Sequence, residues 1–172
     1  MSAHTPTMTT TEYAAQIRST LKKAHGWSSR QVSVRAEYFS MGSSLEVVVK
    51  DPTIPLPVVK AVAEQAESIR RCEISGEILG GGNRYVSVKY SHEAQQAIGS
   101  RYLEAVQKAV DAVTLGSSRL EPIGDTGFLV GRPNAWLLTL WGPDSAGCLG
   151  QHNGPQSIAE TIGALIVARE AA

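Results

Sequence analysis

Residues 31–51 read QVSVRAEYFSMGSSLEVVVKD, and this stretch decides the fold of the chain. Two runs of alternating apolar and polar residues flank a short Gly/Ser segment. The apolar positions recur at every second residue, which is the period of a β-strand with one buried face. They are Val32, Val34, Ala36 and Tyr38 in the first run and Leu45, Val47 and Val49 in the second. The stretch predicts a β-hairpin whose apolar face must be covered by other elements.

Amphipathic helices predicted on either side of the hairpin can cover this face. Thr9 and Glu12 have the spacing of a capping box, in which each residue satisfies a free amide at the helix start. The helix predicted over Glu12–Ala24 has apolar residues three or four positions apart, and Gly26 suits its left-handed end. A second helix is predicted over Pro57–Arg70, after a proline-bearing connector. Its apolar stripe is Val58, Val62, Ala66 and Ile69, with Val59 beside them.

The rest of the chain continues the mixture of strands and helices. We expect strands at Arg84–Tyr90, Leu120–Ile123, Gly127–Val130 and Ala135–Trp141, a long helix over Glu93–Val113, and a C-terminal helix marked by Ile158, Ile162, Leu165 and Ile166. The predicted fold class is α+β: a small antiparallel sheet with helices packed mainly on one face, followed by a C-terminal strand and helix extension. The predicted domains are residues 9–114 and 115–172.

Composition places the chain among ordinary globular proteins. It has 172 residues, of which 42% are hydrophobic and 19% are charged. No apolar run approaches the roughly 20 residues of a membrane span, and the N-terminus lacks the pattern of a signal peptide, so we expect a cytoplasmic protein. Sixteen basic and sixteen acidic residues cancel, which argues against a general nucleic-acid or membrane binder. Two cysteines are too few for a disulfide framework.

A local basic patch nevertheless favours nucleic-acid binding as an alternative function. Cations outnumber acids around the first helix and strand, although a solvated helix face explains the same pattern. The residues predicted to contact nucleic acid are Arg18, Lys22, Lys23, Arg30 and Arg35.

The last predicted strand, Ala135–Trp141, is apolar on both faces. Such a strand is buried on both sides or covered by a partner. Trp136, Leu138 and Trp141 are therefore candidate interface residues, with core packing as the alternative.

Short motifs for catalysis or cofactor binding are weak. Residues 80–82 are three glycines, but they precede a strand and lack the Lys-Ser/Thr ending of a phosphate loop, so a plain turn is expected. Cys148 and His152 could form a nucleophilic pair, but no third group is evident. Residues 153–157 open the last helix and could hold an anion, although capping of the helix is the preferred explanation. No cofactor or metal and no enzymatic activity are predicted.

Four segments resemble a known family: YAAQIRSTLKKA from Tyr13, VSVR from Val32, GSSLEVVVKDP from Gly42 and RYVSVKYS from Arg84. Together they are similar to the large polyvalent protein-associated domain 29 family of mobile genetic elements, over residues 9–110. The family occurs in giant fused proteins of phages and integrative elements, and also as short stand-alone proteins. The chain departs from the family at residues 70–82, where the family usually has an acidic, aromatic-bearing loop.

The resemblance implies that the protein comes from a mobile genetic element, but it does not imply a chemical reaction. We expect a non-enzymatic binding protein of a phage or integrative element, acting through protein–protein contacts or self-association, for instance in counter-defence. Nucleic-acid binding through the basic patch is the alternative, and no membrane partner is expected.

Overall fold

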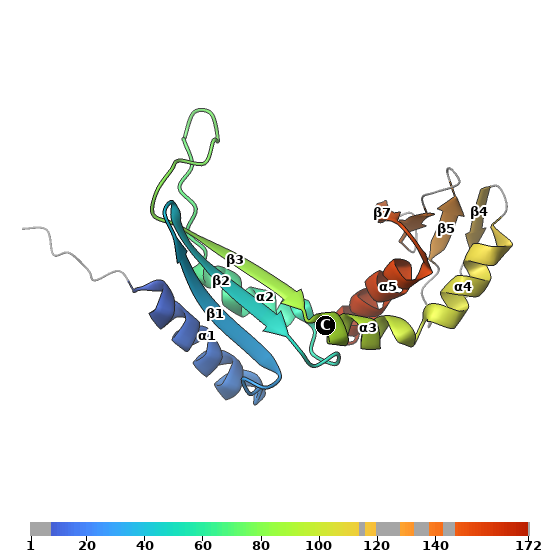
Figure 1. The fold of residues 1–172 in the computed structure, drawn as a ribbon, viewed down its shortest axis with the longest axis horizontal. Helices are drawn as coiled ribbons and strands as arrows, with labels where there is room; N and C mark the ends of the chain where they lie inside the picture. Colours follow the sequence, from blue (N-terminus) through green and yellow to red (C-terminus); the bar gives the residue numbers. More distant parts are fainter. Residues whose placement is uncertain (1–7, 114–115, 120–127, 133–137, 143–146, 172) are drawn as a thin grey trace, which may run out of the picture. The chain divides into compact units, whose positions relative to one another are not determined.

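The computed structural model describes residues 8–113, 116–119, 128–132, 138–142 and 147–171 (Figure 1). The fold class is α+β, as predicted. The chain forms two compact units that divide between Ser91 and His92. Within the described ranges, no helix is both long enough and apolar enough to cross a membrane.

The first unit contains three helical segments and a three-stranded sheet. Its elements are α1 (Thr10–His25), β1 (Val32–Phe39), β2 (Gly42–Val49), α2 (Leu56–Ala63), the 3-10 helix η1 (Glu64–Ala66) and β3 (Asn83–Tyr90). The strand order is β1-β2-β3; β1 is antiparallel to β2, and β3 is parallel to β2. The sheet is therefore mixed rather than purely antiparallel, because the chain crosses over through α2 before β3 pairs.

The central strand β2 confirms the predicted buried face. Leu45, Val47 and Val49 are completely buried, and Val47 lies between Val34 of β1 and Val88 of β3. Helices α1 and α2 contact each other and cover this face with two sets of buried side chains: Ala14, Ile17 and Leu21 from α1, and Val59 and Ala63 from α2. Of the predicted face of β1, Val32 and Val34 are buried, Ala36 is half-buried and Tyr38 is exposed.

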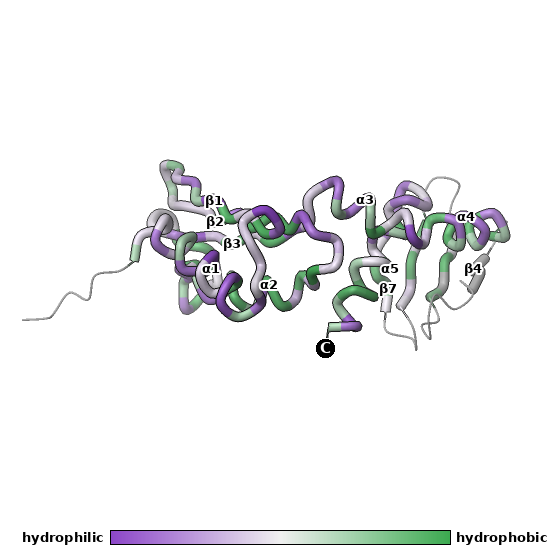
Figure 2. Tube along the Cα trace, turned by 90° about the horizontal axis from the view of Figure 1, so that it is seen from below, coloured by the Kyte–Doolittle hydropathy of each residue, from purple (hydrophilic) through white to green (hydrophobic). Residues whose placement is uncertain are grey.

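Helix α1 begins and ends where the sequence indicates. The backbone N–H of Thr9 donates to the Glu12 carboxylate at 2.6 Å, and the N–H of Glu12 donates to the Thr9 hydroxyl at 3.3 Å, which completes the capping box. Gly26 ends the helix with a φ of 72°. Its buried residues Thr10, Ala14, Ile17 and Leu21 recur every three or four positions, and Figure 2 shows both hydrophilic and hydrophobic segments along the helix.

The second helix differs from its prediction in both register and length. Its buried side chains are Val59, Ala63 and Ala66, and helical structure ends at Ala66 rather than at Arg70. The chain becomes extended there, because Ser68 pairs with Arg84 of β3 through two backbone hydrogen bonds of 2.9 and 2.8 Å.

The described residues of the second unit form three helices and four short strands. Its elements are α3 (His92–Ser100), α4 (Leu103–Ala112), β4 (Gly116–Arg119), β5 (Leu129–Arg132), β6 (Leu138–Trp141), β7 (Cys148–His152) and α5 (Pro155–Glu170). The strands pair antiparallel in the order β4-β5-β6-β7. The predicted strand at residues 120–123 lies outside the described residues. The predicted long helix is interrupted at residues 101–102, so that α3 and α4 are separate helices.

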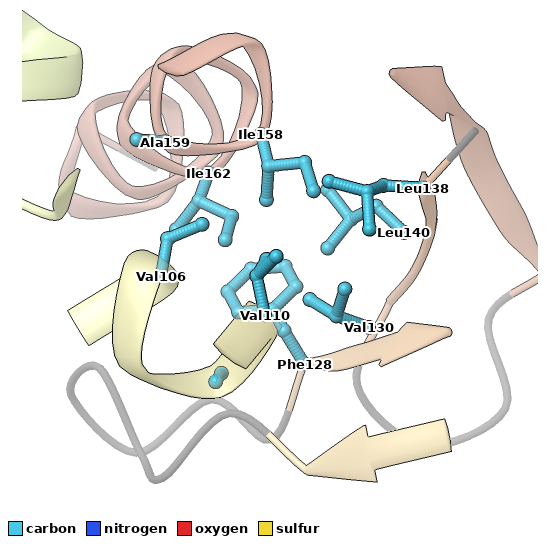
Figure 3. Packing of buried hydrophobic residues seen from close by; sticks show 10 residues of the cluster. Val106, Val110, Phe128, Val130, Leu138, Leu140, Ile158, Ala159 and Ile162 are labelled. Carbon is cyan, nitrogen blue, oxygen red and sulfur yellow. The ribbon is translucent and has the colours of Figure 1, made fainter. Parts of the chain in front are cut away.

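The core of the second unit lies between α4, α5 and the sheet (Figure 3). Val106 and Val110 from α4 and Ile158 and Ile162 from α5 point toward side chains of the strands. The strand side comprises Phe128, Val130, Leu138 and Leu140. Because α3 and α4 both contact α5, the compact units divide before α3, whereas the sequence placed the boundary after residue 114.

Helices α3 and α5 approach each other closely at two glycines. A Cβ atom on Gly163 would overlap the Cγ2 atom of Ile98 and lie 3.1 Å from the Ile98 carbonyl oxygen. A Cβ atom on Gly99 would lie 2.6 Å from the Cγ atom of Glu160. Larger residues at these positions would hold the two helices apart.

Candidate binding surface

Residues 67–82 form an arm that projects beyond the end of the first sheet (Figure 1). The Ser68–Arg84 backbone pair closes its base. Further out, the N–H of Leu79 donates to the Arg70 carbonyl at 2.9 Å, and the N–H of Cys72 donates to the Glu77 carbonyl at 2.8 Å. The chain turns at the end of the arm, where Gly76 has a φ of 71°. The arm is thus a hydrogen-bonded hairpin-like loop.

Asn83, at the start of β3, anchors the arm to the sheet. Its side chain is 2% exposed and makes polar contacts on both sides of the arm. Its Oδ1 accepts from the N–H of Arg70 at 2.9 Å, and its Nδ2 donates to the carbonyl of Leu79 at 2.7 Å. Asn83 also pairs with Gly42 of β2, where a Cβ atom would collide with the Asn83 carbonyl. These contacts fix the direction in which the arm leaves the sheet.

The arm and the adjacent hairpin end expose five large apolar side chains, which together we call the arm surface. They are Ile74 (97% exposed), Met41 (57%), Ile78 (48%), Phe39 (46%) and Leu79 (40%). A Cβ atom on Gly80 would lie 3.0 Å from the Cε atom of Met41, so the hairpin end touches the returning limb of the arm. The Phe39 ring stacks with Tyr85 of β3 at a centroid distance of 6.2 Å. The hairpin end therefore contacts the returning limb of the arm and β3, while Ile74 lies further out near the turn.

Both signs of charge surround the arm surface. Arg70, Arg71, Glu73 and Glu77 are all exposed. Among the described residues the only salt bridge is Lys89–Glu46, so none of the four arm charges belongs to one. The Nη1 of Arg71 donates to the carbonyl of Gly76 at 3.3 Å, and the hydroxyl of Ser75 donates to Glu77 at 3.3 Å. The charges of the arm are therefore available to a partner.

The residues predicted to bind nucleic acid do not form one patch. Arg18 donates through Nη2 to the Val34 carbonyl at 2.6 Å, along β1. Arg35 pairs in register with Glu46, one residue out of phase with the buried face, and therefore points to the opposite face of the sheet. Lys22, Lys23 and Arg30 remain exposed at the end of α1 and in the turn before β1.

The turn region also contains an aromatic pair that the prediction did not include. The rings of His25 and Trp27 stack with a centroid distance of 4.4 Å and an interplanar angle of 17°. The sequence did contain a signal for this pair. His25 and Trp27 lie between Lys23 and Arg30, within residues 13–36, which contain no acidic residue.

The candidate interface on the last predicted strand is largely internal. Leu138 is 5% exposed and belongs to the core of the second unit, so its side chain cannot contact a partner. Trp141 is half-buried, and Trp136 lies outside the described residues.

Cys148 and His152 lie at opposite ends of β7 and cannot form the considered nucleophilic pair. Cys148 pairs with Trp141 and His152 with Leu138, and four strand steps separate them by roughly 13 Å. His152 instead lies 2.8 Å through Nδ1 from the hydroxyl of Ser157, and its buried Nε2 has no hydrogen-bond partner among the described residues. Burial lowers the pKa of His152, which weakens this imidazole as a proton acceptor.

Other conventional sites have little support in the described part of the chain. A groove between α1 and α2 has a volume of about 130 Å³, which is below the range of several hundred Å³ typical of ligand pockets. No group of three or more His, Cys, Asp or Glu side chains there is arranged to hold a metal ion. The three glycines at residues 80–82 form a turn before β3, with positive φ angles at Gly81 and Gly82, and no helix follows them directly.

Comparison with known proteins finds no matching family model, no matching curated protein and no matching solved structure. The arm surface is therefore the feature of the described residues on which a functional proposal can be built.

Proposed function

We propose that this protein acts by binding another protein through the arm surface. The main observation in support is that the arm, which Asn83 anchors, and the adjacent hairpin end expose five large apolar side chains. The most exposed of them is Ile74, at 97%. Joined apolar patches on soluble proteins commonly mark interaction sites. An arm already ordered by hydrogen bonds loses less conformational entropy on binding than a flexible loop would.

The proposed setting is a phage or integrative element. Its support is the resemblance of residues 9–110 to the polyvalent protein-associated family. In this setting the protein would serve counter-defence by occupying a surface of a host complex. Inhibition by occupation needs a stable interface, on the order of 800 Å² from each partner. The arm surface would form the centre of such an interface, with the arm charges at its rim.

Site-specific photo-crosslinking tests the protein-binding proposal. A photoreactive residue replaces Ile74 in one variant and Leu165 of α5 in a control, because both side chains are apolar and exposed (97% and 39%). We expect a discrete crosslinked protein from position 74 and not from position 165. The captured protein is then purified, and its affinity for the wild type, Ile74→Asp and Leu165→Asp is measured.

We expect Ile74→Asp to weaken binding at least about tenfold, as loss of a central apolar anchor does, and Leu165→Asp to leave it unchanged. The thermal midpoints of both variants should match that of the wild type, because both positions are exposed. Equal crosslinking from the two positions, or unchanged affinity of Ile74→Asp, would contradict the proposal.

Nucleic-acid binding is a second candidate, with a different surface. Lys22, Lys23 and Arg30 are exposed around the stacked His25–Trp27 pair, in a stretch without acidic residues. Cations can neutralise phosphates, and an exposed aromatic ring can stack on a base. This combination favours single-stranded nucleic acid over duplex.

Titration of labelled single-stranded and duplex oligonucleotides at two salt concentrations tests this candidate. Binding should weaken as salt rises, and the double variant K22E/K23E should lose it. K60E/K108E, which reverses exposed lysines on α2 and α4, is the control of equal charge change. Equal binding by the two double variants, or no binding at low salt, would exclude this surface.

A further inference from the structure

We propose that the arm surface binds a second copy of this chain, in a two-fold symmetric dimer of antiparallel arms. This inference rests on the proposed function, which is protein binding through the arm surface, and it names a second copy of the chain as the partner at this surface in place of a host protein. A two-fold interface uses the same patch on both copies, so the patch must be complementary to itself. The distribution of charge and apolar side chains along the arm meets this requirement.

The Arg71–Ile78 bridge divides the arm into two halves of different chemistry. The half toward the sheet contains Arg70 and Leu79 and lies beside the hairpin end. The half toward the turn contains Glu73, Ile74 and Glu77. A cation with apolar neighbours therefore occupies one half, and the other half holds an exposed isoleucine, two acids and the guanidinium of Arg71, with a net formal charge of −1.

Antiparallel packing of two arms pairs these unlike halves. The Ile74 side chain of each copy then meets the apolar residues near the sheet in the other copy, which are Leu79, Phe39 and Met41. Glu73 and Glu77 of each copy lie beside Arg70 of the other. Parallel packing would place acids against acids, which opposes association. The two glutamates beside Ile74 likewise disfavour an anionic membrane surface as the occupant.

The remaining cations near the arm have contacts within the chain. Arg71 donates to the Gly76 carbonyl, so its charge lies toward the turn. Arg84 donates through Nε to the Ala66 carbonyl and lies over the Tyr13 ring, 3.8 Å from its centroid. Arg70 donates only its backbone N–H to Asn83, and its side chain is exposed. It is therefore the cation best placed for the acids of the second copy.

A charge-swap experiment tests the dimer. The variants are Arg70→Glu and Glu73→Arg, two exposed positions at which no buried contact is lost. Each variant alone places like charges at both symmetric contacts between positions 70 and 73, whereas an equal mixture of the two restores opposite charges at both of these contacts; Glu77 is the same in every variant. Molar mass is measured by light scattering and sedimentation for the wild type, each variant, the mixture, Ile74→Asp and the control Lys108→Glu.

We expect dimers for the wild type and Lys108→Glu, monomers for each swap variant and for Ile74→Asp, and recovery of the dimer in the mixture. Like charges should weaken the association of each swap variant by at least about tenfold. Circular dichroism should show the same fold and melting temperature for every variant, because all the positions are exposed.

A monomeric wild type, or swap variants that stay dimeric, would overturn the dimer. Swap variants that become monomeric without recovery in the mixture would also overturn it, because the antiparallel pairing would be absent. If position 74 still crosslinks to a different protein, only the identity of the partner fails. If Ile74→Asp retains every interaction, both the dimer and the proposed function fail.

Discussion

Strand β2 of the first unit and strand β6 of the second bury their side chains in different patterns. In β2, buried residues alternate with half-buried ones from Gly42 to Val49. In β6, the consecutive residues Leu138, Thr139 and Leu140 are all buried. The first sheet therefore has one covered and one accessible face, whereas β6 is enclosed on both. Alternation is visible in a sequence, while enclosure depends on what the rest of the chain places around a strand.

The main helices of the two units differ in a similar way. Helix α1 carries its own start and stop signals, because the Thr9–Glu12 capping box and Gly26 lie in the local sequence. Helix α5 has no side-chain hydrogen bond at its N-cap, Gly154, and instead packs closely on α3 at Gly163. Local signals define the first helix, and tertiary contacts support the second.

The largest expected effect comes from charge placed on the covered face of β2. Val47→Asp should lower the free energy of unfolding by several kcal/mol, since an unpaired carboxylate would enter an apolar layer. The neighbouring Val48→Asp should cost far less, because Val48 is half-buried and points to the accessible face. Urea denaturation of the two variants measures the difference.

The corresponding neighbours in β6 should behave differently. Leu140→Asp and Thr139→Asp should both be strongly destabilising, because both positions are buried. Equal effects of Val47→Asp and Val48→Asp, or a harmless Thr139→Asp, would contradict the contrast between the strands.

Adding one methyl group between α3 and α5 tests the close helix packing of the second unit. Gly→Ala in an open helix stabilises by about 1 kcal/mol, whereas overpacking a core costs about 1 to 3 kcal/mol. We expect Gly163→Ala to lower stability on balance, because the new Cβ would meet both the side chain and the backbone carbonyl of Ile98. Leu165→Ala on the same helix is the exposed control. A higher melting temperature for Gly163→Ala would show that the helices can separate at little cost.

Removing the cap of α1 should have a moderate effect. Thr9→Ala deletes the hydroxyl that accepts from the Glu12 amide, and loss of such a cap costs about 1 kcal/mol. Thr9→Ser retains the hydroxyl and is the matched control. Thermal unfolding of the two variants measures the cap, and equal melting temperatures would mean that packing alone holds the start of α1.

The smallest expected effect is a pH dependence of the second unit. Burial lowers the pKa of His152 below its usual value near 6.5, so the folded state binds a proton less readily than the unfolded state. Stability should therefore be fully present above pH 6.5 and decline as the pH falls toward the lowered pKa. Carboxylates with lowered pKa, such as Asp51, act in the same direction but below about pH 4.

Urea midpoints between pH 5 and pH 8 measure this slope. His152→Gln should flatten it, while Leu165→Gln, at an exposed position on α5 that has no titratable group, should retain it. A slope unchanged by His152→Gln would assign the pH dependence to other groups.

Sequence patterns predicted the local elements, but they did not predict the features that depend on contacts between distant parts of the chain. The hairpin, α1, its caps and β3 follow from period and spacing within short stretches. The parallel pairing of β3 does not, because it depends on a crossover of more than thirty residues. The register of α2 was wrong because Val58 and Val59 fit an apolar stripe equally well, and only the position of the sheet selects Val59.

The candidate binding surface was not predicted, for a related reason. Phe39 falls out of phase with the predicted buried face and Met41 lies in the turn of the hairpin, and both side chains are exposed. Ile74 and Ile78 lie in a segment for which no helix or strand was predicted. Conversely, Leu138 looked available to a partner and is enclosed. Residue type predicted apolar character in each case, and tertiary structure determined which side chains reach solvent.

The parallel pairing of β2 and β3 also bears on the order of folding. The β1–β2 hairpin closes through a two-residue turn, whereas β3 can join β2 only after α2 and the arm have been spanned. Contacts that close long segments form late, because their entropic cost precedes their stabilisation. We expect pulse-labelled hydrogen exchange to protect the hairpin amides before those of β3. The base of the arm would close only when β3 pairs with β2. Ile74 would therefore be presented on an ordered, hydrogen-bonded arm only in chains whose first sheet is complete.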